Sequence, residues 1–95
     1  MKIVVTEDAA NWYKQELHLK DNDSLRFFVR YGGFGGQIPG FSLGVSEESP
    51  IQVHASTTVN KITFFIEEAD EWYFEDKNLH IHFDKEHQEP MFIYK

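Results

Sequence analysis

The sequence predicts an α+β domain with mainly antiparallel sheet and two helices. Its 95 residues suit a single domain, residues 1–95, and 41% hydrophobic and 16% aromatic content is enough for a packed core. Apolar and polar residues alternate in several short segments, which predicts six or seven strands. Helical spacing of apolar residues is limited to one segment, and a second, shorter helix follows a strand. Strands therefore dominate.

A short strand and a helix are expected first. Met1–Val5 predicts the strand, and Thr6 is a favourable N-cap because its hydroxyl can accept a hydrogen bond from the first turn. The helix is expected to end near His18. Its apolar stripe repeats at three- and four-residue spacing and consists of Ala9, Ala10, Tyr13 and Leu17.

The middle of the chain predicts strands separated by turns. Alternation places one strand at Leu25–Tyr31, and strand character resumes at Gln37–Val45 after a glycine-rich turn. A third, short strand is expected at Ile51–Ala55. The apolar residues of Lys61–Ile66 predict a further strand.

The last third predicts a short helix and two closing strands. Glu67–Phe74 is the expected helix, with acidic residues in its first turn, where the helix dipole favours them. Leu79–Asp84 alternates apolar and polar residues as a half-buried strand does, and Met91–Tyr94 is the terminal strand.

Charge and composition exclude several classes of function. The net charge of −7 opposes binding to nucleic acid or to an anionic membrane surface, since both require a basic face. Apolar runs are too short to span a bilayer. The chain has no Cys, so it has neither a disulfide framework nor thiolate ligands for a cluster. We expect a cytoplasmic protein that carries no cofactor.

The turn Gly32–Gly36 is the first candidate site, with Gly33, Phe34 and Gly35 as its binding residues. It matches neither the phosphate-binding loop nor the dinucleotide motif. One interpretation is a turn that needs positive φ angles. The other is a small-ligand site lined by Arg30, Tyr31 and Phe34. An exposed Phe34 would instead indicate a contact patch, and a buried one a core residue.

A row of histidines is the second candidate. His80 and His82 are two residues apart on the expected strand, so both side chains leave the same face, and Asp84 continues that face. Neutral imidazoles and a carboxylate can hold a transition metal. The competing interpretation is the solvated polar face of an amphipathic strand.

The chain resembles the HesB/IscA family of iron–sulfur cluster assembly proteins, in particular its short, cysteine-free YneR-like members. The resemblance is carried by these segments: Thr6–Ala10, Leu25–Gly36, Phe41–Leu43, Ile62–Ile66, Trp72–Phe74, Leu79–Phe83 and Gln88–Tyr94. It implies a β-sandwich-like fold of mainly antiparallel strands with two helices. It also implies self-association as a homodimer.

The family's cluster ligands are absent. Phe34 stands where the family has its first ligating Cys, and the printed sequence contains no Cys-Gly-Cys near Lys95. The resemblance therefore implies a non-enzymatic protein that acts through protein partners near iron–sulfur metabolism. Metal binding by His80 and His82, or ligand binding at Gly32–Gly36, is the alternative function.

Overall fold

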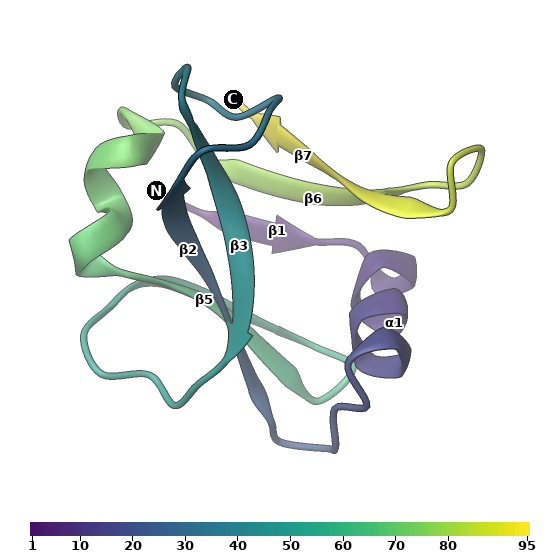
Figure 1. Cartoon of the computed structure of the whole chain (residues 1–95). Helices are drawn as coiled ribbons and strands as arrows, with labels where there is room; N and C mark the ends of the chain where they lie inside the picture. Colours follow the sequence, from purple (N-terminus) through teal and green to yellow (C-terminus); the bar gives the residue numbers. More distant parts are fainter.

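The computed structural model describes residues 1–95 and contains two sheets, one α-helix and one 3₁₀ helix (Figure 1). The elements follow the chain in this order: β1 (Ile3–Val5), α1 (Glu7–Glu16), β2 (Ser24–Tyr31), β3 (Phe41–Glu47), β4 (Val53–Val59), β5 (Ile62–Glu67), the 3₁₀ helix η1 (Glu68–Phe74), β6 (Leu79–Asp84) and β7 (Glu89–Tyr94). The α+β prediction is confirmed.

The two sheets are built mostly from antiparallel pairs. One has the order β1-β6-β7 and the other β3-β2-β5-β4. The pairs β2–β3, β4–β5 and β6–β7 are antiparallel, whereas β1–β6 and β2–β5 are parallel. Strand β3 and strand β7 each lie at an edge of their sheet. Figure 1 shows β7 to the right of β3, with α1 below β7.

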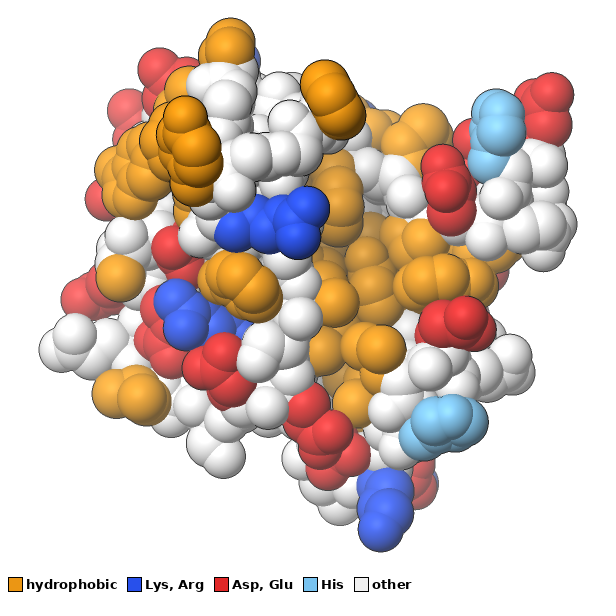
Figure 2. Space-filling view, viewed as in Figure 1, with side chains coloured by type: hydrophobic (Ala, Val, Ile, Leu, Met, Phe, Trp, Pro, Cys, Tyr) orange, Lys and Arg blue, Asp and Glu red, His pale blue; other side chains and the backbone are white.

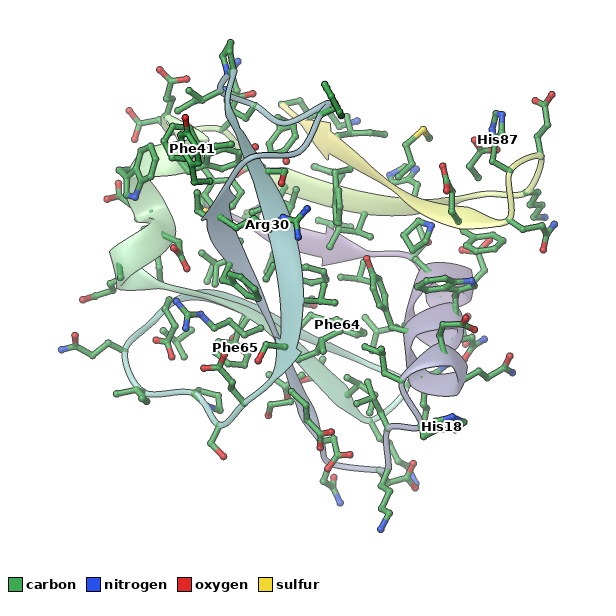
Figure 3. The ribbon with its side chains drawn as sticks, in the orientation of Figure 1. His18, Arg30, Phe41, Phe64, Phe65 and His87 are labelled. Carbon is green, nitrogen blue, oxygen red and sulfur yellow. The ribbon has the colours of Figure 1, made fainter.

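Aromatic side chains fill the core between the sheets. Phe27 of β2 stacks on Phe64 of β5 with ring centroids 6.1 Å apart, and the ring of Tyr13 from α1 meets Phe27 edge-on at 5.6 Å. Phe92 of β7 contacts Phe27 from the other sheet at 5.9 Å. Edge-to-face and stacked pairs of this kind add to the stability gained from burial. Phe64 and Phe65, adjacent in sequence, are both fully buried, and only Phe64 belongs to this core (Figure 3).

The start of α1 follows the predicted cap, and its end does not. The Thr6 hydroxyl accepts a hydrogen bond from the backbone N–H of Ala9 at 3.4 Å. The helix ends at Glu16, before His18, which has a positive φ of 52°. Leu17 is consequently exposed, and Leu19 takes its expected place in the core.

Three other predicted boundaries are wrong. The segment 37–40 is loop, because the chain turns through Pro39 and Gly40 before β3 begins at Phe41. Strand β4 continues to Val59, since its Ser and Thr residues pair with β5. Strand β7 begins at Glu89 rather than at Met91. The predicted second helix is present, and it is a 3₁₀ helix. No helix in the structure has the length and apolar character needed to cross a membrane.

Candidate functional site

The glycine-rich turn is fixed by steric requirements at two positions. Gly33 has a φ of +82°, and a Cβ there would lie 2.4 Å from the Ser42 hydroxyl oxygen. At Gly36 a Cβ would lie 2.1 Å from the carbonyl oxygen of Phe41. Both distances are too short for any side chain, so glycine is required for the loop to close against β3. The prediction of positive φ angles in this turn is confirmed at Gly32, Gly33 and Gly35.

The helix η1 lies beside this loop and is anchored from two sides. Asp70 of η1 is buried and accepts a hydrogen bond from the Arg26 guanidinium at 2.9 Å. Glu67, just before η1, is also buried and accepts hydrogen bonds from the backbone N–H groups of Ile51 and Gln52 at 2.9 and 2.7 Å. Charge-assisted bonds of this kind are stronger than neutral ones. They hold η1 in place next to β2 and β4.

Aromatic side chains lie where the loop, β3 and η1 meet. We call this surface the aromatic end. It consists of Tyr31, Phe41 and Trp72, which contact one another, and of Phe34, which projects from the loop. Phe34 is fully exposed, Tyr31 is 87% exposed and Trp72 is half exposed. The rings of Tyr31 and Phe41 meet edge-on at 5.7 Å, and those of Phe41 and Trp72 at 5.3 Å. Figure 3 shows Phe41 between the loop and η1.

The exposure of Phe34 decides between the interpretations of the loop. A fully exposed ring at the tip makes the tip convex, so Arg30, Tyr31 and Phe34 do not enclose a small-ligand pocket there. Large aromatic residues that are exposed in a group are typical of protein contact surfaces. The side chain of Arg30 leaves the loop and donates from Nε to the Ser42 hydroxyl at 3.0 Å.

The predicted metal ligands are only partly brought together. The rings of His80 and His82 lie side by side on β6, with centroids 6.1 Å apart, and partial burial lowers the pKa of His80. Asp84 is not oriented toward them. Its carboxylate binds Nδ1 of His87 at 2.6 Å, and the polar side-chain atoms of Asp84, Glu86 and His87 lie within 4.8 Å of one another. The row His80, His82 and Asp84 is therefore not a ligand set in this structure.

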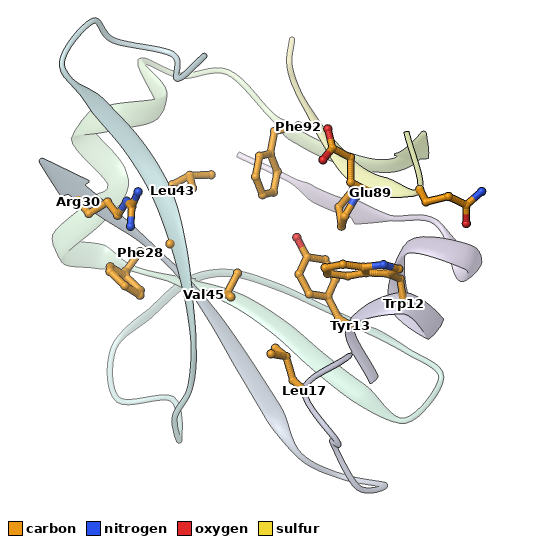
Figure 4. A pocket seen from close by; sticks show the side chains of 12 residues that line it. Trp12, Tyr13, Leu17, Phe28, Arg30, Leu43, Val45, Glu89 and Phe92 are labelled. Atoms are coloured by element: carbon orange, nitrogen blue, oxygen red, sulfur yellow. The ribbon is translucent and has the colours of Figure 1, made fainter. Parts of the chain in front are cut away.

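A cleft between the edges of the two sheets was not predicted. It has a volume of about 670 Å³, and we call it the β3–β7 cleft. Its lining residues come from α1, β2, β3 and the segment around β7: Trp12, Tyr13, Leu17, Phe28, Arg30, Leu43, Gly44, Val45, Gln88, Glu89, Pro90 and Phe92. Figure 2 shows it as an apolar hollow, and Figure 4 shows Leu43 and Val45 facing Phe92 and Tyr13 across it.

Comparison with known proteins gives one informative name. A Bacillus subtilis protein named pyruvate dehydrogenase inhibitor is 45% identical over 95 residues, which is the full length of both chains. A Staphylococcus epidermidis protein is 37% identical over 98 residues, covering 100% of this chain and 98% of its own length. A Staphylococcus saprophyticus protein is 38% identical over 84 residues, or 85% and 86%. The names of the two staphylococcal proteins assign no function. No family model and no solved structure matches.

These findings correct the expected family and function. The resemblance to HesB/IscA proteins is wrong, because no such family matches and the full-length relative bears the name of an enzyme inhibitor. A role near iron–sulfur metabolism is wrong for the same reason. Metal binding by His80, His82 and Asp84 has no support from the name or from the geometry.

Proposed function

We propose a function from one premise: the chain belongs to the family of the Bacillus subtilis protein named pyruvate dehydrogenase inhibitor. It is a regulatory protein that binds pyruvate dehydrogenase and lowers its activity. The observation that carries this proposal is 45% identity over the full length of both chains. Such a regulator acts by contact, so it needs neither a catalytic centre nor a cofactor of its own, and we expect it in the cytoplasm with its target.

The aromatic end is the contact surface that we propose for this function. Aromatic residues contribute a large share of the binding energy in protein interfaces, because each buries a large area with few rotatable bonds. Phe34 projects from a loop that Gly33 and Gly36 hold against β3, so little conformational entropy is lost when its ring is covered. Gly33, Phe34 and Gly35 thereby form the tip of the proposed contact.

The test is inhibition of purified pyruvate dehydrogenase complex, followed as pyruvate-dependent NADH formation. The wild-type chain is expected to lower the rate and to co-sediment with the complex. Phe34→Ala is expected to weaken inhibition by about tenfold or more, in the range of interface hot spots. Ile51→Ala is the matched control, because Ile51 is 86% exposed on another loop. It is expected to inhibit as the wild type does.

Two outcomes would contradict the proposal at different levels. A wild-type chain that neither binds nor slows the complex would overturn the function. Full inhibition by Phe34→Ala and by Tyr31→Ala would leave the function in place and remove the aromatic end as its contact surface. Circular dichroism of each variant establishes that the fold is retained.

A further inference from the structure

The free edge of β3 is unlike the other three sheet edges. Strand β1 is only three residues long, β4 has an irregular register between Val53 and Ala55, and β7 contains Pro90. Short strands, bulges and prolines are the features that protect an edge from pairing with another chain. Strand β3, with the sequence FSLGVSE, has seven residues, an unbroken register with β2, no Pro and no Lys.

Hydrogen bonding shows which backbone groups of β3 are free. The N–H of Gly32 donates to the carbonyl of Gly40 at 2.7 Å, which marks this pair as a hydrogen-bonded one. Bonded and non-bonded pairs alternate along an antiparallel ladder. Leu43 and Val45 are therefore non-bonded positions, and their N–H and C=O groups point away from β2. Their side chains line the β3–β7 cleft.

The edge of the opposite wall is interrupted. Asn78 and Lys95 exchange backbone hydrogen bonds at 2.9 and 3.0 Å, so the same alternation makes Phe83 and Pro90 a non-bonded pair. The nitrogen of Pro90 then faces the cleft side of β7, where it has no hydrogen to donate. The edge of β3 is uninterrupted by comparison, so an added strand is expected to pair with β3 and to pack against β7.

The hydroxyl of Tyr13 opens into the cleft and has no partner within the protein. The side chain of Tyr13 is only 4% exposed, lines the cleft, and makes no hydrogen bond within the protein. Figure 4 shows its hydroxyl directed toward Phe92 in the cleft. The hydroxyl is therefore free to donate a hydrogen bond to a group that enters the cleft.

The charge at the rim indicates what kind of segment fits. Arg30 lines the cleft and donates to Ser42, and no carboxylate of this chain pairs with it. Arg30 comes from β2, and Figure 3 shows its side chain reaching across β3. A carboxylate from a partner would satisfy the guanidinium. The other charged lining residue, Glu89, lies on β7, so the acidic residue of a bound segment is expected at the β3 wall, beside Arg30.

We propose that the β3–β7 cleft binds an extended acidic segment of a partner protein as an added strand on β3. Alternate apolar side chains of the segment enter the cleft, the Tyr13 hydroxyl donates to one of its carbonyls, and one carboxylate pairs with Arg30. This is recognition by strand addition, in which main-chain bonds give affinity and alternate side chains give selectivity. It does not depend on pyruvate dehydrogenase.

Random displayed peptides are selected for binding to the immobilised chain. The selected peptides are then synthesised, and their binding is measured. The Trp72→Phe variant leaves Trp12 as the only tryptophan, so its fluorescence reports on the cleft directly. Selected peptides are expected to alternate apolar residues and to carry an acidic one. N-methylation of one peptide amide at a time is expected to impair binding only at every second position, as an added strand requires.

Three variants test the assigned contacts. Tyr13→Phe and Arg30→Gln are each expected to weaken peptide binding by about fivefold, and Val45→Pro, which removes a free edge N–H, by about tenfold or more. Ile51→Ala is the control outside the cleft. The proposal is overturned if the peptides bind all three variants as they bind the wild type, if the selection enriches no peptide, or if N-methylation is tolerated at every position. It is also overturned if sedimentation shows a dimer that Val45→Pro abolishes, because a second copy of the chain would then occupy the β3 edge.

Discussion

The backbone N–H of Gln37 donates a hydrogen bond to the Tyr73 hydroxyl at 2.5 Å. Tyr73 is fully buried in η1, whereas Gln37 follows directly on the glycine-rich turn. The same hydroxyl lies 3.4 Å from that of Tyr94 in β7. One phenol thus joins η1, the loop and the three-stranded sheet, and the loop that carries Phe34 is positioned from inside the core.

Tyr73→Phe removes this bond and keeps the ring in the core. We expect a loss of about 1 kcal/mol in the free energy of unfolding, because the Gln37 amide loses its partner. Urea denaturation measures the loss, and hydrogen exchange is expected to show faster exchange at Gln37. Unchanged exchange would contradict a positioning role for Tyr73. Tyr31→Phe, at an exposed tyrosine, is the control.

Gly36→Ala and Gly35→Ala separate two reasons for glycine in the turn. At Gly36 the new Cβ would collide with the Phe41 carbonyl, and the backbone would have to move. At Gly35 nothing lies within 4 Å, and only the φ of +76° is unfavourable. We expect a loss of about 1 kcal/mol for Gly35→Ala and a larger one for Gly36→Ala. Thermal unfolding compares them, and equal losses would show that the loop can shift at no cost.

Glu67→Ala leaves the backbone N–H groups of Ile51 and Gln52 without their acceptor. Because the carboxylate is buried and charged, we expect unfolding to become easier by about 2 kcal/mol. Glu68→Ala is the matched control, since Glu68 is the exposed neighbour. Urea denaturation of both variants checks this prediction, and a Glu67→Ala protein as stable as the control would refute it.

The pair Asp84–His87 makes stability depend on pH. The hydrogen bond between them raises the pKa of His87 above its ordinary 6.5 and lowers that of Asp84 below its ordinary 3.8. The contribution is lost as pH rises through the raised His87 pKa, and lost as pH falls through the lowered Asp84 pKa. The free energy of unfolding that His87→Gln removes should therefore be largest between pH 3.8 and pH 6.5.

The measurement is unfolding of wild type and His87→Gln across pH, with an NMR titration of His87. Asp84→Asn is the partner variant, and it is expected to bring the pKa of His87 back toward 6.5. A His87 pKa that does not respond to Asp84→Asn would show that the two side chains do not interact in solution. Because both groups are solvent-screened, the effect is expected to shrink in high salt.

The alternation of apolar and polar residues predicted the strands well, but it could not predict features formed by segments that are distant in the sequence. Alternation located β6 at its observed bounds, and the Thr6 cap was correct, because both depend on neighbouring residues. Segment 37–40 was wrong because Ile38 has strand character, whereas the adjacent Pro39 and Gly40 decide the conformation. The β3–β7 cleft was missed because its walls come from segments far apart in the sequence. Pro39, just before β3, and Pro90, within β7, are the local signs of these edge strands.

The parallel pairing of β1 with β6 also sets an order of assembly. Ile3 lies opposite Leu79, so the first strand has no sheet to join until the last quarter of the chain has been synthesised. Closing a loop of that length costs entropy before any contact compensates for it. During translation the four-stranded sheet, whose strands lie within residues 24–67, can form first. We therefore expect the pairing of β1 with β6 to form late in folding, after the four-stranded sheet.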